Sequence, residues 1–395
     1  MRRPPENGAQ PSSITNLKTR LMARGAEPFI RTERVIRFKR SIFKESGLVG
    51  VLVVLGLFLS IFGGSLQVTD RDTGNVTKVN KFMRADNLDR LAKNTSFFAI
   101  MAVGATFVII TGGIDLSVGA VYCLAAVCGA MFLTRFGPHG IGAGASPFLV
   151  VPGAVLVCLG TGALCGFING IGVVGLRVHP FVITLGTMAI YRGIAFVMTN
   201  AQAFTDFPVQ FTDGFIRHEI HFQGAILYPV PLAIMLGVTA FAWWFLKHSV
   251  TGRQIFAVGG NEQAALFSGL PVNWVKLKVY TFSGLTAGIA AMIMLGYYGS
   301  ASSDAGKGYE LDVIAAAVVG GASLIGGRGT ALGALLGALI IQVINNGIII
   351  LNIDQNYSQI IIGAVIVLAV LLDRINNSMR EKRLTRVTQT AKSGS

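Results

Sequence analysis

The chain has 395 residues, of which 52% are hydrophobic and only 13% charged, with a formal net charge of +14. Soluble domains carry about 25% charged residues, so this composition excludes an ordinary soluble enzyme and indicates a membrane protein. The positive charge does not indicate a nucleic-acid partner, because Lys and Arg gather in the two tails and in loops on one side of the apolar segments. That distribution orients a protein in a bilayer.

Apolar segments recur along the chain and predict an all-α polytopic membrane protein with about ten transmembrane helices. The predicted spans are 48–62, 94–111, 118–136, 148–168, 180–198, 228–246, 279–296, 311–325, 330–351 and 360–372. Both termini then lie on the same side, and the positive-inside rule predicts that this side is the cytoplasm.

The predicted organisation has three parts. A basic cytoplasmic tail covers 1–46, a transmembrane domain with a cytoplasmic loop at 247–278 covers 47–372, and a second basic cytoplasmic tail covers 373–395. Within the first tail, residues 34–44 either form an amphipathic helix on anionic headgroups or belong to a disordered segment.

The motif Gly-Gly-Ile-Asp-Leu-Ser at 112–117 separates the second and third predicted spans. A carboxylate between two apolar runs must reach the membrane interface or find a partner inside the bundle, so Asp115 is a candidate functional residue. Three roles are open for it. It caps a helix break, where the alternative capping residue is Ser117, or it contacts a transported substrate, or it relays protons.

The fifth predicted span begins at a His-Pro pair, and Pro suits the first turn of a helix. Phe181 and Thr184 are expected to share a face of this helix. Arg192 lies deeper in the span and has no charged neighbour within reach along the chain. It must therefore extend to the interface or pair with another helix, and Glu310 and Asp312 are the candidate partners.

Glycines recur every four residues at 162, 166 and 170 and again at 329, 333 and 337. This spacing puts them on one helix face and predicts close approach of neighbouring helices, inside the protein or at a subunit interface. The four cysteines, at 123, 128, 158 and 165, fall within apolar runs and are expected to be packing residues rather than metal ligands. The chain contains no Walker motif, so it cannot hydrolyse ATP by that route.

The longest polar interruption on the side of the basic tails is Thr251–Pro271, TGRQIFAVGGNEQAALFSGLP. Asn261 can cap a short helix over 262–267, after a turn at 259–261 and before a stop at 269–271. We expect a membrane protein that holds a short helix with small residues in a cytoplasmic loop to present that helix to a motor subunit.

Four segments, 112–119, 180–187, 251–271 and 309–330, resemble in order the motifs of permeases from monosaccharide ABC importers of the ribose, galactose and xylose type. The resemblance covers roughly residues 94–373. Two departures fall in the polar loop. The family usually has an acidic residue where Gln263 stands and often a basic one at Leu266, so the charges offered to an ATPase differ here.

The resemblance implies a transport subunit with no catalytic residues, metal or cofactor of its own, because ATP and Mg²⁺ bind to separate ABC ATPase subunits. It implies further partners: a periplasmic or lipid-anchored sugar-binding protein, a second permease subunit, and the lipids of a bacterial cytoplasmic (inner) membrane. The second subunit is either another copy of this chain, as a homodimer, or a homologue. The residues implied to couple the permease to its ATPase are Gly252, Arg253, Gly259, Gly260, Asn261, Ala264, Ala265, Ser268 and Gly269.

A sugar path needs uncharged hydrogen-bonding groups and aromatic faces rather than net charge. The candidate path residues are Asp115, Ser117, Asn169, Phe181, Thr184, Thr187, Tyr191, Asn345 and Asn346. Nothing in the sequence selects one monosaccharide. The alternatives are a nucleoside ABC permease, a proton-coupled secondary transporter that uses Asp115 or Glu310, and a membrane scaffold that transports nothing.

Overall fold

The computed structural model describes residues 46–69, 76–222 and 225–371. The chain forms two compact units, Met1–Gly50 and Val51–Ser395, and every contact described below lies within the second. The predictions for the tails, including the amphipathic helix at 34–44, lie outside the described residues.

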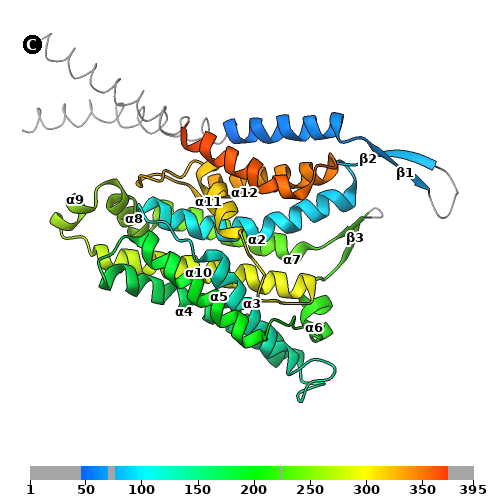
Figure 1. Ribbon diagram of the computed structural model, residues 1–395, viewed down its shortest axis with the longest axis horizontal. Coiled ribbons are helices and arrows are strands. Elements are labelled where there is room, and N and C mark those ends of the chain that lie inside the picture. The colour runs from blue at the N-terminus through cyan, green and yellow to red at the C-terminus, as the bar shows by residue number, and fades with distance from the viewer. Residues whose placement is uncertain (1–45, 70–75, 223–224, 372–395) are drawn as a thin grey trace, which may run out of the picture. The chain divides into compact units, whose positions relative to one another are not determined.

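Each predicted span overlaps a helix in the described part of the chain (Figure 1). These helices are Ser46–Phe62, α2 (Ala85–Ile110), α3 (Val118–Thr134), α4 (Pro147–Gly175), α5 (Pro180–Thr199), α7 (Pro229–His248), α10 (Val272–Tyr298), α11 (Tyr309–Val319), α12 (Ala331–Ile350) and Gln355–Leu371. Six of the described helices, namely α2, α4, α5, α7, α10 and α12, are long and apolar enough to cross a membrane. The count of about ten crossings and the side on which the termini lie stay predictions.

Several helix ends differ from the predicted spans, because polar residues continue a helix beyond its apolar run. The second span was expected to start at 94, yet α2 begins at Ala85. The loop was expected to extend to 278, yet α10 begins at Val272. In the other direction, α11 ends at Val319 rather than near 325, because a turn with Gly321 at φ 92° follows it.

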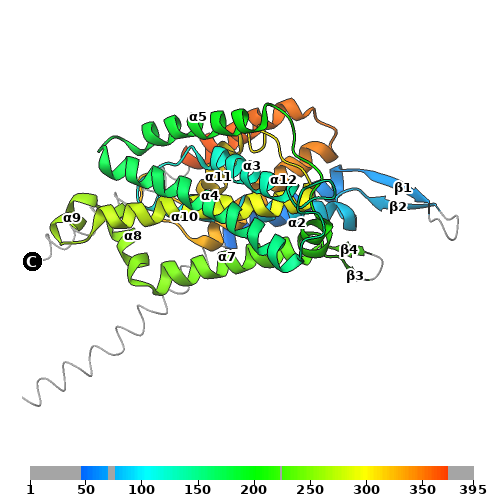
Figure 2. The same cartoon turned by 90° about the horizontal axis from the view of Figure 1, so that it is seen from below.

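The all-α expectation is incomplete, since two antiparallel hairpins lie in the polar connections. One pairs β1 (Ser65–Thr69) with β2 (Val76–Asn80), and the other pairs β3 (Ile220–Phe222) with β4 (Ala225–Leu227). The shorter helical turns in the connections are α6 (Val209–Phe211) and η1 (Thr212–Ile216). The 3₁₀ turn η2 (Gln355–Tyr357) begins the helix Gln355–Leu371. Figure 2 shows both hairpins at one end of the helix bundle and α8 (Val250–Gly260) with α9 (Glu262–Phe267) at the other.

Helices α2 and α10 form the centre of the bundle, where 94% and 78% of their apolar windows are buried. Helices α4, α5 and α7 bury 28% or less of theirs and turn Leu, Ile and Phe outward. An apolar outer surface of this kind is what lipid requires, since the acyl chains are as apolar as the side chains.

The glycine rows confirm the predicted close packing inside this chain, except that Gly329 lies before α12 (Ala331–Ile350) and does not share a face of it with Gly333 and Gly337. On α4, Gly162 and Gly166 face α10 so closely that a Cβ would overlap its backbone, which has glycines at 284 and 288 there. On α12, Gly333 and Gly337 meet α11 and the turn after it in the same way. The four cysteines are free thiols on α3 and α4.

Candidate functional site

The polar loop after α7 contains two helices rather than one. Ser249 ends α7, and its hydroxyl accepts a hydrogen bond from the Gly252 amide (2.8 Å), which caps the start of α8. A turn was expected at 259–261, but α8 continues through Gly260 and the chain bends only at Asn261. The reason is that neither Gly259 nor Gly260 takes a positive φ, so both continue the helix.

The short helix α9 occurs where the sequence predicts it. The Asn261 side chain accepts a hydrogen bond from the Ala264 amide (2.9 Å), as expected of an N-cap. At the other end, the Ser268 hydroxyl donates to the Ala264 carbonyl (2.8 Å), and Gly269 has φ 75°. This local hydrogen bonding defines both ends of α9.

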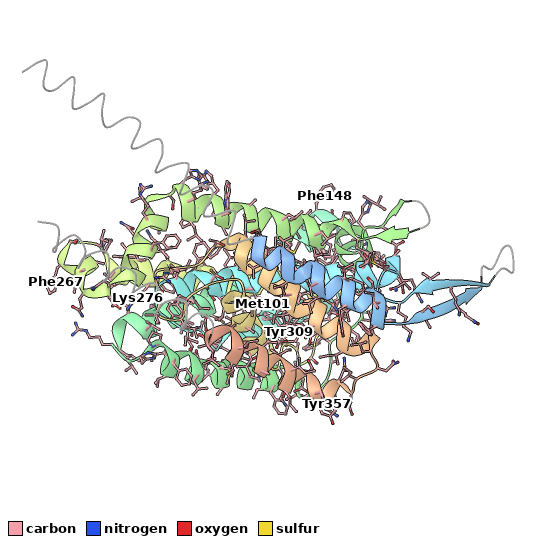
Figure 3. The ribbon with its side chains drawn as sticks, turned by 90° about the horizontal axis from the view of Figure 1, so that it is seen from above. Met101, Phe148, Phe267, Lys276, Tyr309 and Tyr357 are labelled. Atoms are coloured by element: carbon pink, nitrogen blue, oxygen red, sulfur yellow. The ribbon has the colours of Figure 1, made fainter. Side chains whose placement is uncertain are left out.

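Most of α9 is exposed. Only Ala265 is buried, and the Glu262 carboxylate pairs with the Lys276 ammonium of α10 (2.6 Å), so the helix is held at a fixed angle. On its outer face, Leu266 is 56% and Phe267 86% exposed. Figure 3 shows Phe267 at the end of the bundle, with Lys276 further in. Arg253, near the start of α8, is exposed as well, so both helices of this loop offer side chains to a partner.

The far end of α8 packs against two loops that the sequence motifs mark separately. Gly259 lies against the Ile110 carbonyl oxygen at the end of α2. The same oxygen accepts a hydrogen bond from the Gly327 amide (2.8 Å). Gly326 approaches both Gly259 and Gly112. We call this meeting point of α8, the end of α2 and the 320–330 loop the glycine junction.

From the glycine junction the chain runs directly into the Asp115 motif. One Asp115 oxygen accepts hydrogen bonds from the Ser117 amide (2.9 Å) and hydroxyl (2.6 Å), and the other accepts one from the Ser283 hydroxyl of α10 (3.1 Å). Asp115 is 4% exposed, and no Lys or Arg in the described part of the chain forms an ion pair with it. These bonds hold the turn between α2 and α3 through Asp115. Ser117, although it is the N-cap residue of α3, makes no capping bond with its own side chain.

Further buried polar groups extend this cluster to α4 and α5. The Asn169 amide donates to the Ser117 hydroxyl (2.7 Å) and accepts from the Tyr191 hydroxyl (3.2 Å). The Thr184 hydroxyl donates to the Ile114 carbonyl (3.2 Å). The predicted path residues Asp115, Ser117, Asn169, Thr184 and Tyr191 therefore form one connected network, which we call the Asp115 cluster.

The other predicted path residues lie elsewhere. Phe181 and Thr184 lie one turn apart on α5 as expected, but the Phe181 side chain is exposed while that of Thr184 is buried. The Thr187 hydroxyl donates to the Thr184 carbonyl (3.3 Å). Asn346 exchanges two hydrogen bonds with Asn87 of α2 (2.7 and 3.2 Å), and Asn345 accepts one from Ser358 (2.8 Å). These asparagines join α12 to its neighbours and are not connected to the Asp115 cluster.

Arg192 finds a partner that the sequence proposed. Its guanidinium lies 3.7 Å from the Glu310 carboxylate and also donates to the carbonyls of Ala305 (3.3 Å) and Gly306 (3.2 Å). The arginine therefore holds the connection between α10 and α11 against α5. Sequence reasoning missed the carbonyl partners and Ser283, because a hydroxyl or a backbone oxygen carries no signal of its own.

This architecture, in which membrane-length helices enclose a buried polar cluster and a short helix projects from one end, defines a multi-pass membrane permease. Residues 87–370 match the family described as branched-chain amino acid transport system / permease component, and the chain belongs to this family.

Three relatives are similar over most of the chain. The ribose import permease protein of Haemophilus influenzae is 41% identical over 293 residues, which is 74% of this chain and 86% of that protein. The D-allose transport system permease protein of Escherichia coli is 34% identical (82% and 91%), and the fructose import permease protein of Rhizobium meliloti is 31% identical (82% and 84%). No solved structure matches the chain.

Proposed function

We propose that this chain is the permease subunit of an ATP-driven ABC importer that carries a monosaccharide across a bacterial cytoplasmic membrane. The names of its relatives, which import ribose, allose or fructose, support this substrate class. The observation that carries the proposal is α9, a capped and anchored helix with an exposed apolar tip at the end of the bundle where the glycine junction lies.

In this proposal an ATPase subunit, which holds ATP and Mg²⁺, binds the outer face of α9 on the cytoplasmic side. Its closure pushes α9 and, through the continuous backbone, α8. Since Gly259 leaves no gap at the Ile110 carbonyl, a shift of α8 must displace the end of α2 and the loop that carries Asp115. A tightly packed contact transmits movement in this way because interiors have little free volume.

In this proposal the displacement of α8 is passed on to the Asp115 cluster. It joins the 112–117 loop to α4, α5 and α10 through hydrogen bonds, so a displaced loop alters the angles between those helices. Its hydroxyl, amide and phenol groups are the uncharged kind that binds a sugar. A sugar-binding protein is expected to deliver the substrate at the hairpin end, and a second permease copy completes the path.

One alternative has an observation in its favour. The carboxyl group of Asp115 is buried and forms no ion pair with a described residue, and a buried carboxyl group is also what a proton carrier would use. Nothing observed favours a nucleoside as the substrate over a sugar.

Right-side-out membrane vesicles that contain the permease with its ATPase, with ATP enclosed and the binding protein supplied outside, separate these functions. The importer requires ATP and the binding protein for transport of labelled ribose, allose or fructose, and a protonophore leaves that transport unchanged. Transport that stops with the protonophore and proceeds without ATP would contradict the proposal.

A further inference from the structure

Four phenylalanines form a closed ring between α2, α7 and α10. Phe107 lies 4.5 Å from Phe282 and 6.1 Å from Phe245 between ring centres. Phe241 completes the ring at 5.8 Å from Phe245 and 6.4 Å from Phe282. Phe107 is buried in the core, whereas Phe241 is 51% exposed, so the ring leads from the outer surface of the bundle to its interior.

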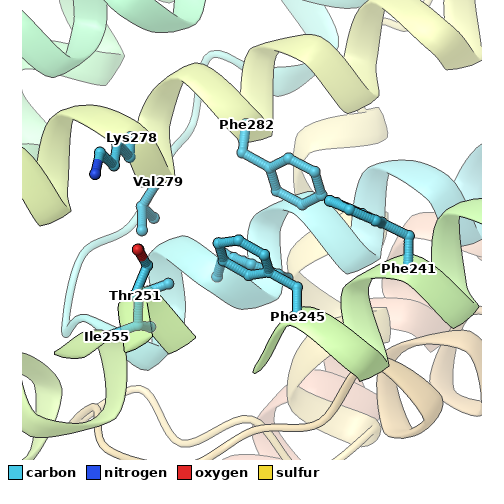
Figure 4. Close-up of a pocket in the computed structure, with 8 residues that line it drawn as sticks. Phe241, Phe245, Thr251, Ile255, Lys278, Val279 and Phe282 are labelled. Atoms are coloured by element: carbon cyan, nitrogen blue, oxygen red, sulfur yellow. The ribbon is translucent and has the colours of Figure 1, made fainter. Parts of the chain in front are cut away.

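The ring borders a cavity of about 210 Å³ whose remaining lining comes from Thr251, Ile255, Lys278 and Val279 (Figure 4). A dry apolar cavity of roughly 150 Å³ is enough to hold benzene, so this one has room for part of a hydrocarbon chain. Thr251 and Lys278 supply its only polar side chains. A sugar needs many hydrogen-bonding partners, so the cavity does not suit the transported substrate.

A positive charge at the rim of the cavity indicates that the polar end of a ligand bound there is anionic. The Lys278 side chain is exposed and has no ion-pair partner among the described residues, unlike Lys276, which Glu262 neutralises. Nearby at the end of α7, the Lys247 ammonium lies over the Trp243 ring, 4.8 Å from its centre. Trp and Lys together mark the level of lipid headgroups.

We propose that this cavity binds one acyl chain of an anionic phospholipid and that Lys278 binds the phosphate of its headgroup. The apolar ring and the single cation match the two ends of such a lipid, and basic pockets between membrane helices bind anionic headgroups. A bound chain contacts α2, α7, α8 and α10 at once. It therefore braces the bend at Ser249, where α7 passes into α8.

Native mass spectrometry of the purified full-length protein tests the site with phosphatidylglycerol and phosphatidylcholine that carry identical acyl chains. We expect one phosphatidylglycerol to be retained in preference to phosphatidylcholine. Lys278→Gln should reduce that preference about fivefold, the worth of one basic side chain near an anionic surface. Lys307→Gln, which removes an exposed lysine elsewhere, is the matched control and should change nothing.

The acyl chain is located by fluorescence. A tryptophan placed by Phe282→Trp, with Trp243, Trp244 and Trp274 replaced by Phe, should be quenched by brominated phosphatidylglycerol at low mole fraction until the site saturates. Thr251→Phe fills the cavity and should abolish this saturable phase. Equal retention of both lipids, or quenching that rises only in proportion to mole fraction, would overturn the proposal.

Discussion

Gly259 of α8 packs directly against the carbonyl oxygen of Ile110, so the two residues leave no room for a side chain between them. This contact connects the loop helices to the last turn of α2, only a few residues before Asp115. It gives the proposed coupling a physical route, because the two segments cannot move independently.

Gly259→Ala should therefore abolish or strongly reduce ATP-driven uptake, since the added methyl overlaps the Ile110 carbonyl and forces the junction apart. Overpacking of this kind typically costs about 1–3 kcal/mol. Gly237→Ala, within α7, is the matched control, because nothing lies within 4 Å of a Cβ at Gly237 and this residue is outside the loop that binds the ATPase. Thermal unfolding and vesicle uptake of both variants, measured side by side, check the prediction, and equal uptake by the two would count against the coupling route.

Asn261→Ala should weaken binding of the ATPase without unfolding the bundle. The substitution removes the bond to the Ala264 amide and destabilises α9 by about 0.5–2 kcal/mol. Asn261→Ser restores a capping oxygen and should recover binding. The measurement is the affinity of each variant for the ATPase, determined by surface plasmon resonance with the permease immobilised. An alanine variant that binds the ATPase as tightly as the serine variant contradicts the prediction.

Asp115→Asn distinguishes the helix-break role from a proton relay. Asparagine keeps an oxygen that accepts from Ser117, so the loop should keep its shape and uptake should persist. Asp115→Ala leaves the buried donors of Ser117 and Ser283 without an acceptor and should lose stability by about 1–3 kcal/mol. Loss of uptake in the asparagine variant at unchanged melting temperature would instead support proton transfer.

Lys93 should be one of the most costly charged residues to remove. It is 5% exposed, forms an ion pair with Asp89, and lies 4.0 Å from the centre of the Tyr228 ring and 4.5 Å from that of Tyr297. Lys93→Met leaves the largely enclosed carboxylate of Asp89, whose side chain is 10% exposed, without its partner, at a cost of about 3–5 kcal/mol.

The double variant Lys93→Met with Asp89→Asn removes both charges and should recover part of that loss. A double-mutant cycle on thermal stability measures the coupling. Additive single effects would show that the pair contributes nothing. The exposed pair of Arg84 and Asp86 serves as the control, and breaking it should have little effect.

The sequence predicted the features that depend on neighbouring residues. The cap at Asn261, the extent of α9 and the glycine rows all follow from local geometry, and the structure confirms them. It did not predict the contact of Gly259 with Ile110, or that Lys93 lies in a helix between two tyrosines. Those features depend on packing between segments far apart in the chain. The sequence analysis missed the two hairpins because they lie in polar connections, and a polar segment is predicted as a loop when hydropathy is the only criterion.

The central claim is that the exposed face of α9 is where a separate ATPase drives this permease. Phe267→Ser changes a side chain that is 86% exposed, and Phe148→Ser changes one that is 91% exposed at the start of α4, so neither should disturb folding. Co-purification of the ATPase, with its stimulation by sugar-loaded binding protein, is the most direct measurement. We predict that Phe267→Ser loses both and Phe148→Ser loses neither; full co-purification and stimulation with Phe267→Ser would contradict the claim.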